Sequence, residues 1–448
     1  MAEITWKSIL TKLVGGDHLT AEESEWFVDD LMQGNANPAA VGAALAMQQQ
    51  LGLTADEVRG AAKAMVSHAV PLNVSGGTTD IVGTGGDGFA TVNLSTMGSV
   101  AAAAAGVKIV KHGNRAASSK CGAADVLEAL GLPLDLKPEA VGEVGDEVGI
   151  TFAFARTFHP AMRFVGPIRA ALGIPCVFNI LGPLTNPANL AHVAIGCANR
   201  KVSPIMAAVY ASRGQSGLVY TSHEGMDELA PTGPVSVWEI RDGKVTESEF
   251  DPTVDLGLAK ITVEQLKGGV PDVNANAFKD FLAGKDIPSR TTALLNAASA
   301  IVADGNLVGN GTLAERFAEA TSWPRKPSIP ARPKPVRQVD RNRQVQGVIW
   351  NGFARICLPF LHYQLFRVAG VHRLQFVTYL GSTAITDETR PQYIGSLSLT
   401  PRLQTAHWAV RLTAQPQRGE PRTTQPTRAT PSRRRRNSRP DHRGGLCG

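Results

Sequence analysis

A glycine-rich turn, Gly83-Thr84-Gly85-Gly86-Asp87, has the residue types needed to hold an anion. Glycines let the backbone approach a ligand closely, and successive N–H groups beside a helix N-terminus supply partial positive charge. The spacing matches neither the Walker A loop nor the dinucleotide fingerprint, and a lone turn of this kind can also be an ordinary tight loop. Asp87 favours a ligand site, because a carboxylate beside bound phosphate needs a ribose hydroxyl, a metal-bound water or a cation to compensate it.

Two polar segments follow this turn and are expected to lie close to it. Asn93-Leu94-Ser95-Thr96 stands at the head of the next predicted helix, where its hydroxyls either cap the helix or bind phosphate or Mg²⁺. Lys111-His112-Gly113-Asn114-Arg115 ends the second predicted strand. Ligands of open α/β sheets gather at the carboxyl ends of strands, although a surface charge cluster would have the same composition. Ser118-Ser119-Lys120 forms a second hydroxyl-rich entry to a helix.

The elements that must position these residues form a helical unit followed by an α/β unit. Thr20 with Glu23 and Thr54 with Glu57 are capping-box pairs, and Asn37 precedes a proline at a first helical position. Beyond this unit the pattern changes to β-loop-α-β, which implies a parallel sheet. The predicted strands are 80–83, 107–111, 174–180, 192–197 and 217–222, with a hairpin of 235–240 and 244–250 and helices at 92–106, 122–131, 204–214 and 294–305.

The charge of the chain is divided unevenly between its body and its C-terminal part. Overall, 45 Lys and Arg residues face 39 Asp and Glu residues in a chain of 448. Residues 324–448 hold 22 basic and five acidic residues, whereas residues 1–323 hold 23 basic and 34 acidic residues. The body is therefore an acidic globular protein, and a nucleic-acid interpretation based on total charge would rest on the C-terminal part alone.

The cysteines and the apolar runs bear on the cellular compartment. Five scattered cysteines without a CxxC spacing favour a reducing cytoplasm and argue against a disulfide framework or a thiolate metal site. The first residues, MAEITWKSILTKLVGG, lack the apolar run of a signal peptide, and no stretch reaches the roughly 20 apolar residues of a spanning helix. The sequence therefore predicts a soluble, cytoplasmic protein without membrane contact.

Five blocks of the sequence closely resemble the anthranilate phosphoribosyltransferase family in order and spacing. They are GTGGDG…TVNLST, KHGNRAASSKCGAADVLEALG, FHPAMRFVGPIRAALG, FNILGPLTNPA and GMDEL, and the resemblance covers roughly residues 1–320. It implies transfer of phosphoribosyl from 5-phosphoribosyl 1-diphosphate to the amine of anthranilate, with release of pyrophosphate, in tryptophan biosynthesis. It also implies a dependence on Mg²⁺ and a homodimer formed through the N-terminal helices.

The resemblance implies a fold and a division into domains. The fold is of the nucleoside phosphorylase/phosphoribosyltransferase type, with a small N-terminal helical domain and a large mixed α/β domain around a central, mainly parallel sheet. The helical domain is expected at residues 1–70, joined by a segment near 166–190. The α/β domain, expected at 71–320, would bind the diphosphate substrate, and residues 321–448 form an atypical Pro/Arg-rich tail.

The resemblance also implies roles for single residues. The residues implied to bind 5-phosphoribosyl 1-diphosphate are Gly83, Gly86, Asp87, Thr91, Asn93, Leu94, Ser95, Thr96, Lys111, His112, Gly113, Asn114, Arg115, Ala116, Ala117, Ser118, Ser119 and Ala123. Those implied for anthranilate are Gly83, Asn114 and Arg169, and those implied for two Mg²⁺ ions per subunit are Ser95, Asp227 and Glu228.

The chemistry of the implied reaction is consistent with these residue types. Arg169 suits the carboxylate of anthranilate because a guanidinium can bind it through two hydrogen bonds, although without the family resemblance a helix-surface ion pair would be favoured. His112 and His159 are candidates to line the aryl site, and His159 in FHP is equally compatible with a structural turn residue. No acid or base catalyst is implied, since the aryl amine is already neutral at pH 7 and the reaction needs positioning and charge stabilisation.

Two features depart from the family pattern. Cys121 stands where a small hydroxyl residue is expected beside the phosphate. The resemblance ends after Ala320, where a Pro/Arg-rich tail with 20 Arg and two Lys takes the place of a closing helix. We interpret residues 321–448 as an out-of-frame or read-through extension, which would leave core surface uncovered and the fold less stable.

Two other functions are compatible with parts of the sequence. A pyrimidine nucleoside phosphorylase shares the helical and α/β architecture and a phosphate loop, but Arg169, the KHGNR block and the pair Asp227-Glu228 argue against it. Such an enzyme would need inorganic phosphate and a nucleoside. A nucleic-acid-binding relative would show salt-dependent DNA binding that survives deletion of residues 321–448, whereas we expect any such binding to disappear with the tail.

Overall fold

The computed structural model describes residues 3–116 and 119–322. The tail from residue 323 onward lies outside the described residues, and so do Ala117 and Ser118. The interpretation of the tail as a frame error therefore stays a prediction. None of the helices in the described ranges is long and apolar enough to cross a membrane.

The N-terminal part is a group of four helices whose ends follow the capping patterns of the sequence. The predicted box at Thr20 is present, with its N–H donating to Glu23 Oε2 at 2.7 Å, and the box at Thr54 is present as well. Helices α2 and α4 approach closely because Gly60 leaves room for the Ala21 carbonyl. The helices are α1 (Trp6–Val14), α2 (Ala21–Gln33), α3 (Pro38–Leu51) and α4 (Ala55–Ser67).

One seven-stranded sheet supports the rest of the described chain. Its order is β3-β2-β1-β4-β5-β6-β7, with parallel pairing from β3 to β5 and antiparallel pairing of β5 with β6 and of β6 with β7. The mainly parallel sheet predicted from the sequence is therefore confirmed. The strands are β1 (Thr79–Gly83), β2 (Ile109–Gly113), β3 (Ile150–Phe154), β4 (His192–Gly196), β5 (Ser216–Ser222), β6 (Val235–Arg241) and β7 (Lys244–Phe250).

The predicted strand at residues 174–180 is wrong. Residues Phe178–Leu184 form helix α10, and the Oδ1 atom of Asn179 accepts a hydrogen bond from the Cys176 N–H at 3.0 Å where the helix begins. A short apolar run fits a buried strand and a buried helix equally well, so its periodicity could not decide. The sequence analysis also missed β3, which is buried along its whole length and pairs with β2 at the edge of the sheet.

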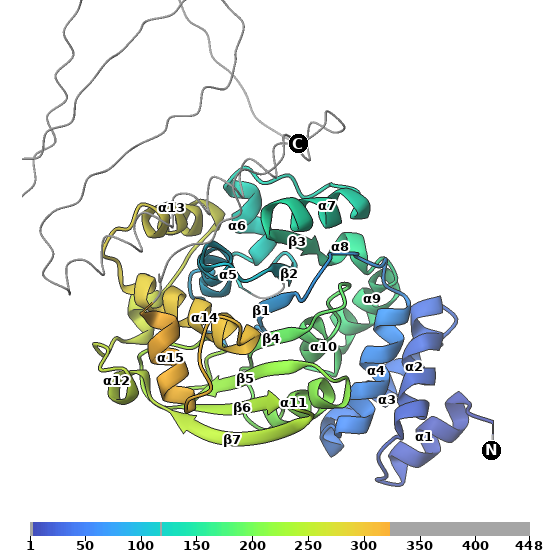
Figure 1. Cartoon of the computed structure of the whole chain (residues 1–448). Helices are drawn as coiled ribbons and strands as arrows, with labels where there is room; N and C mark the ends of the chain where they lie inside the picture. The colour runs from blue at the N-terminus through green and yellow to red at the C-terminus, as the bar shows by residue number, and fades with distance from the viewer. Residues whose placement is uncertain (1–2, 117–118, 323–448) are drawn as a thin grey trace, which may run out of the picture. The chain divides into compact units, whose positions relative to one another are not determined.

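Helices cover both faces of the sheet (Figure 1), and the strand side chains alternate between two cores. Ala194 and Leu218 face α5 and α14, whereas Val193 and Ile195 face α10 and α11. Helix α4 packs on α10 and α11, and α2 and α3 pack on α9. The remaining elements are α5 (Leu94–Ala105), α6 (Ala123–Ala129), α7 (Pro138–Val148), α8 (Ala155–Phe158), α9 (Met162–Leu172), α11 (Ser203–Ser212), α12 (Pro252–Asp255), the 3₁₀ helix η1 (Val263–Leu266), α13 (Pro271–Leu282), α14 (Pro288–Asp304) and α15 (Leu313–Thr321).

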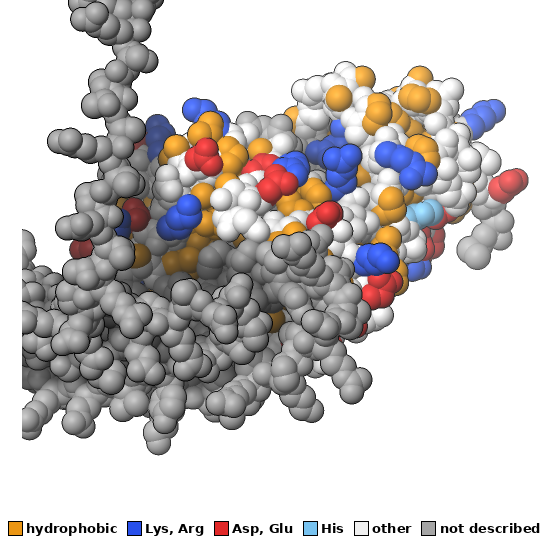
Figure 2. Space-filling view, turned by 90° about the horizontal axis from the view of Figure 1, so that it is seen from above, with side chains coloured by type: hydrophobic (Ala, Val, Ile, Leu, Met, Phe, Trp, Pro, Cys, Tyr) orange, Lys and Arg blue, Asp and Glu red, His pale blue; other side chains and the backbone are white. Residues whose placement is uncertain are grey.

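Helix α15 ends the described part of the α/β domain and packs on α14. Its Phe317 ring stacks on the Phe250 ring of β7, with 4.6 Å between the centroids. The buried Arg316 donates to Glu239 Oε2 of β6 at 2.7 Å. The described residues therefore end in a helix that is anchored by both apolar and ionic contacts. On the part of the surface that is visible in Figure 2, basic side chains lie among acidic ones.

Candidate active site

The turn after β5 lies against the ends of β1 and β4. A Cβ atom at Gly83 would overlap the Asp227 carboxylate, and one at Gly196 would overlap the Asp227 backbone carbonyl. The Gly85 N–H donates to Asp227 Oδ2 at 2.6 Å. Glycine at position 83 is therefore required by Asp227, whereas Gly85 and Gly86 adopt φ angles of 70° and 79° that favour glycine.

Three acidic side chains from two segments meet at this turn: Asp87 of the glycine-rich loop and the neighbours Asp227 and Glu228. Asp227 and Glu228 are 8% and 7% exposed, and the Ser95 N–H at the start of α5 donates to Glu228 Oε1 at 3.2 Å. Burial, together with the charge of Asp87, raises the pKa of Asp227 to about 7. Burial and then the charge of Asp227 raise the pKa of Glu228 well above its usual range. The local structure therefore leaves this negative charge only partly compensated.

Two oxygen atoms of this acidic group have no protein partner. Asp87 Oδ2 and Glu228 Oε2 are buried and accept no hydrogen bond from the described residues. Buried polar atoms in native proteins are nearly always satisfied by protein, by water or by an ion. The two orphan oxygens therefore indicate a position where a cation or its water would bind.

Lys111 of β2 lies beneath the acidic group and is fully buried. Its Nζ donates to the Ile81 carbonyl at 2.7 Å and to Ser95 Oγ at 3.3 Å. Burial lowers the pKa of Lys111, and the charges of Asp80 and Glu228 oppose this effect. Lys111 is thus an internal amine of the site and does not lie on its surface.

Asp80 and Asn186 are further buried polar residues beneath the acidic group, near Lys111. The sequence analysis missed both. Asn186 Nδ2 donates to Asp80 Oδ2 at 2.9 Å and to the Val110 carbonyl at 2.9 Å. The His112 N–H donates to Asp80 Oδ1 at 3.3 Å. Burial raises the pKa of Asp80 to about 6, and the Lys111 charge opposes the rise. A carboxylate at the start of an apolar strand was the signal in the sequence, because a buried acid needs partners.

Two neutral histidines and Arg169 are linked through helix α10. His112 Nδ1 donates to the Gly182 carbonyl at 3.0 Å, and the His112 and His159 rings lie 5.1 Å apart. Burial lowers the pKa of His112 to about 3 and that of His159 to about 4. Arg169 of α9 donates to Asn179 Oδ1 at 3.4 Å. Asn179 and Gly182 lie one helical turn apart, so α10 places Arg169 on the histidine side of the site.

Comparisons with known proteins identify the family. Residues 75–321 match the family described as "Glycosyl transferase family, a/b domain", and residues 7–69 match "Glycosyl transferase family, helical bundle domain". The chain is 48% identical over 316 residues to the anthranilate phosphoribosyltransferase of Arthrobacter sp. (strain FB24), covering 70% of this chain and 89% of the relative. The chain belongs to the anthranilate phosphoribosyltransferase family.

Other members of the anthranilate phosphoribosyltransferase family agree with this assignment. The enzyme of Thermobifida fusca (strain YX) is 46% identical over 311 residues, which cover 69% of this chain and 89% of the relative. The crystal structure of the Thermus thermophilus enzyme superposes with a TM-score of 0.66 at 36% identity, covering 79% of this chain and 99% of the other. A Saccharomyces cerevisiae enzyme in complex with PRPP and Mg shares the fold at 24% identity, with a TM-score of 0.64 and a coverage of 83% of this chain and 99% of that one.

Residues 93–96, at the start of α5, are implied to bind the diphosphate substrate. In the structure some of their side chains lie at the site and others lie in the hydrophobic core. The Ser95 hydroxyl contacts Lys111, and the Asn93 side chain makes no cap to the helix. Leu94 and Thr96 are fully buried, so their side chains belong to the core. The alternative that these hydroxyls only cap the helix is therefore wrong.

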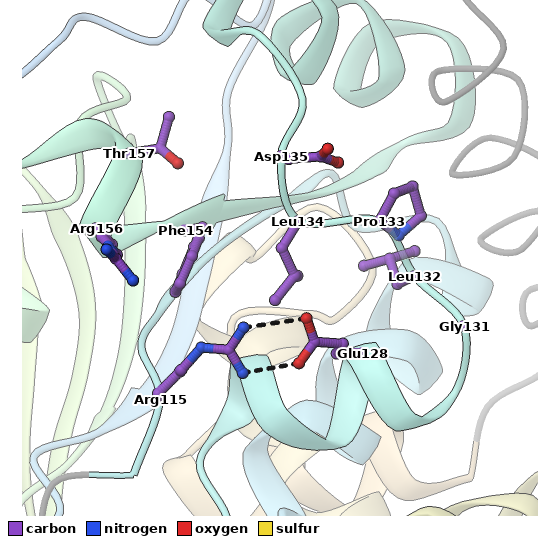
Figure 3. Close-up of a pocket in the computed structure, with 10 residues that line it drawn as sticks. All are labelled: Arg115, Glu128, Gly131, Leu132, Pro133, Leu134, Asp135, Phe154, Arg156 and Thr157. Carbon is purple, nitrogen blue, oxygen red and sulfur yellow. Dashed lines mark hydrogen bonds and ion pairs between the residues drawn. The ribbon is translucent and has the colours of Figure 1, made fainter.

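The loop after β2 holds Arg115 in an ion pair. Figure 3 shows its guanidinium bound to both carboxylate oxygens of Glu128, at 2.7 and 3.0 Å, and it also donates to Asp125 at 3.0 Å. The guanidinium lies 5.7 Å from the centre of the Phe154 ring and lines a cavity of about 750 Å³. Arg115 would have to leave Glu128 before it could bind a phosphate group fully.

The other residues implied by the family resemblance lie around this loop. Asn114 Oδ1 accepts from the Arg115 N–H at 2.8 Å, and the Ala116 N–H donates to Asp125 Oδ2 at 2.9 Å. Ala123 begins α6 close to Gly113, where a Cβ would be tightly packed against it. Thr91 forms an antiparallel bridge with Lys267, Ser119 is exposed, and Ala117 and Ser118 lie outside the described residues.

Cys121 stands beside Asn93 and away from solvent. Its Sγ lies 3.4 Å from Asn93 Oδ1, and the Asn93 amide donates to the Cys121 carbonyl at 3.2 Å. Burial raises the pKa of the Cys121 thiol to about 11. The departure from the family pattern at this position therefore gives a buried, protonated thiol.

The acidic group has a donor set that suits Mg²⁺. No cluster of three or more His, Cys, Asp or Glu side chains in the described ranges is arranged to enclose a metal ion. Mg²⁺, however, is usually bound by one or two carboxylates together with substrate phosphates and water. Asp227, Glu228 and the Ser95 hydroxyl offer oxygen ligands of this kind, and Glu228 Oε2 is unpartnered. The residues present therefore fit the ion.

Proposed function

We propose that this chain transfers phosphoribosyl from 5-phosphoribosyl 1-diphosphate to the amine of anthranilate, in tryptophan biosynthesis, at the ends of β1, β2 and β5. The observation that carries the proposal is the buried pair Asp227 and Glu228 with its unpartnered Glu228 Oε2. A purely structural acidic pair would be expected to have its oxygens satisfied by the protein. The membership of the family supplies the substrates, since the 48% identical relative bears this enzyme name.

Asp227, Glu228 and Ser95 would hold Mg²⁺, and the bound ion would neutralise charge on the diphosphate as it leaves. Two ions per subunit are part of the proposal. The acidic side chains are held for this task by the Gly85 N–H at 2.6 Å and the Ser95 N–H at 3.2 Å. Their raised pKa values follow from burial without full compensation, and a divalent cation would supply the missing positive charge.

The chain's own positive groups would act on the diphosphate as it separates from the ribose. Lys111 would carry a positive charge beneath the site, and the N-terminus of α5 would add the partial positive charge of its helix dipole. These groups are fixed before the substrate binds, so no reorganisation is needed when charge develops in the transition state. The remaining residues implied for this substrate, from Gly83 to Ala123, keep their proposed binding roles.

Arg169 would bind the anthranilate carboxylate, and Asn114 and Gly83 would lie along the same substrate. Within the described residues the Arg169 guanidinium makes one long hydrogen bond, to Asn179 at 3.4 Å, so it is available for a carboxylate. The lowered pKa values of His112 and His159 keep both rings neutral near pH 7, so they neither repel Arg169 nor protonate the amine. The neutral amine then attacks without a dedicated base.

The proposal extends to the organisation of the chain. We place the helical domain at residues 1–70, joined by the segment 166–190, and the α/β domain at 71–320, and family matches ending at 69 and 321 support both boundaries. Residues 321–448 would then be an extension outside the enzyme body. We further propose a cytoplasmic homodimer formed through the N-terminal helices, and the three described cysteines are all free thiols.

The test follows the loss of anthranilate fluorescence in the presence of 5-phosphoribosyl 1-diphosphate and Mg²⁺. The full chain should consume anthranilate only when both are present, and chelation of Mg²⁺ should stop the reaction. Cleavage of a pyrimidine nucleoside with inorganic phosphate, in the absence of anthranilate turnover, would overturn the proposal. A chain ending at Ser322 should keep the activity, because α15 is then intact.

A further inference from the structure

The turn that carries Asp227 and Glu228 is held by one residue of α14. The Asn296 Oδ1 atom accepts from the Leu229 N–H at 3.2 Å, and its Nδ2 donates to the Leu229 carbonyl at 3.1 Å. Leu229 directly follows Glu228 and is fully buried. One side-chain amide therefore satisfies both backbone groups of the residue next to the acidic pair.

The remaining hydrogen-bonding positions of Asn296 are filled as well. Oδ1 also accepts from the Tyr220 hydroxyl of β5 at 3.0 Å, and Nδ2 also donates to the Thr292 carbonyl at 2.8 Å. An asparagine amide has two donor hydrogens and two acceptor positions, so all four are used. Asn296 is fully buried, which leaves no alternative partner in water. Its orientation is therefore fixed by contacts to β5, to the turn and to its own helix.

Asn296 also lies where α14 crosses α5, the helix that receives Glu228. A Cβ atom at Gly98 of α5 would stand only 3.1 Å from the Asn296 Cβ, so glycine permits the close crossing. Ser95, whose N–H binds Glu228, lies one helical turn before Gly98. The two helices are drawn side by side in Figure 1. Asn296 thus contacts both segments that hold Glu228 in place. These are the turn that carries Glu228 and helix α5, whose Ser95 N–H binds the Glu228 carboxylate.

The hydrogen bonds to Asn296 restrain the turn that carries the acidic pair. Asp227 and Glu228 are buried neighbours, and their carboxylates accept from the Gly85 N–H at 2.6 Å and the Ser95 N–H at 3.2 Å. The backbone of Leu229 cannot leave without breaking two buried hydrogen bonds to Asn296. The turn is held in place before any cation binds.

We propose that Asn296 is a positioning residue for the divalent-cation site, fixing the Asp227-Glu228 turn in register with Ser95. The inference rests on the proposed function, because it assigns to Asn296 the orientation of the proposed cation ligands. Partners of metal ligands that do not touch the metal commonly change metal affinity by about 10–100-fold when they are removed. Asn296 should behave as such a partner although it lies in a helix that no site motif includes.

The experiment measures Mn²⁺ binding to the full chain by electron paramagnetic resonance, with 5-phosphoribosyl 1-diphosphate present. Asn296→Ser keeps a hydroxyl for the Thr292 carbonyl but cannot reach Leu229. The matched control is Thr151→Val, which removes a fully buried hydrogen bond to the Val141 carbonyl, 2.8 Å long, in the β3–α7 region. We expect Asn296→Ser to weaken Mn²⁺ binding about ten-fold and the control to leave it within about two-fold.

The outcomes separate the two proposals. If the unchanged protein binds no Mn²⁺ under these conditions, the proposed cation site itself fails. If it binds Mn²⁺ and Asn296→Ser binds it as well as Thr151→Val does, the positioning role is wrong. Steady-state kinetics should show a raised half-saturating Mg²⁺ concentration with an unchanged KM for anthranilate.

A second variant covers the case in which Asn296→Ser does not fold. Tyr220→Phe removes one of the two donors to Asn296 Oδ1 and leaves the bonds to Leu229 in place. We expect it to weaken Mn²⁺ binding by about three-fold, between the control and the main variant. Binding equal to that of Thr151→Val would overturn the proposal.

Discussion

The carboxylate of Asp227 occupies the space that a Cβ atom would need at Gly83. This contact joins the end of β1 to the turn after β5, which is 144 positions further along the chain. It explains why the first glycine of the motif is required even before a substrate is considered. Substitutions at Gly83 and at neighbouring residues of the site are therefore expected to act through contacts of this kind.

Gly83→Ala should displace Asp227 and weaken both divalent-cation binding and turnover. The added Cβ would meet the carboxylate itself, and the backbone carbonyl of Asp227 lies 3.2 Å away, so the turn must shift. We expect turnover to fall by more than about ten-fold, which corresponds to about 1.4 kcal/mol in the activation barrier. Steady-state kinetics at varied Mg²⁺ measures the effect.

The control for this variant is Gly42→Ala in α3. A Cβ there meets nothing within 4 Å and its φ is not positive, so alanine should stabilise the helix by about 0.5–1 kcal/mol without changing turnover. Equal kinetics for Gly83→Ala and the unchanged protein would contradict the steric argument.

His159→Gln should reduce the loss of stability at mildly acidic pH. The pKa of His159 is lowered from its usual 6.5 to about 4 in the folded protein, so below pH 6.5 the unfolded chain binds more protons. Stability is therefore lost as the pH falls from 6.5 toward 4. Between pH 7.5 and 5.5 this group alone should contribute a loss of about 1 kcal/mol.

Urea unfolding of both proteins at pH 7.5 and 5.5 measures this difference. Asp227, with a pKa raised to about 7, acts in the opposite direction in the same range, so only the difference in pH dependence between the two proteins isolates His159. An identical pH dependence for the variant and the unchanged protein would show that His159 is not buried in its neutral form.

Asp80→Asn and Lys111→Met should be strongly non-additive. Both side chains are fully buried and each charge opposes the effect of burial on the other. Removal of one partner of a buried pair costs about 3–5 kcal/mol, because the other charge is left uncompensated. The double variant should be more stable than the sum of the single effects by about 1–3 kcal/mol in denaturant unfolding.

The partly exposed ion pair of Lys108 and Asp146 provides the reference for this comparison of two single variants with their double variant. Its N–O distance is 2.7 Å, but the side chains are 24% and 40% exposed. Lys108→Met and Asp146→Asn should therefore couple by less than about 1 kcal/mol. If the coupling free energy between Asp80 and Lys111 is as small as this, the two buried side chains do not stabilise each other as charges.

Glu128→Gln should free Arg115 for the diphosphate substrate. The pair is partly exposed, so its loss should change stability by less than about 1 kcal/mol. The KM for 5-phosphoribosyl 1-diphosphate should fall, since Arg115 no longer has to leave Glu128. Asp56→Asn, which releases the exposed Arg59 in the helical domain, is the matched control. A rise in this KM, or the same KM as in the control, would exclude Arg115 as a phosphate ligand.

Short-range patterns in the sequence are enough to predict the local part of this protein. The capping boxes at Thr20 and Thr54, the hairpin turn at Asp242-Gly243 and strands β1, β2, β4 and β5 depend on such patterns, and the structure confirms them. The family assignment also followed from the sequence, because five blocks in fixed order do not coincide by chance. These features need no knowledge of how distant segments meet.

Which of these residues form the site depends instead on how the chain packs in three dimensions. The helix at residues 178–184 was missed because an apolar run does not reveal its partners, and α10 is what links Arg169 to His112. Asp80 and Asn296 lie outside every motif block, and Asn186 lies in one without a role implied for it. Their importance comes from contacts with residues 67–106 positions away. Burial and hydrogen bonding of this kind depend on the packing of the whole sheet, and a linear sequence does not record it.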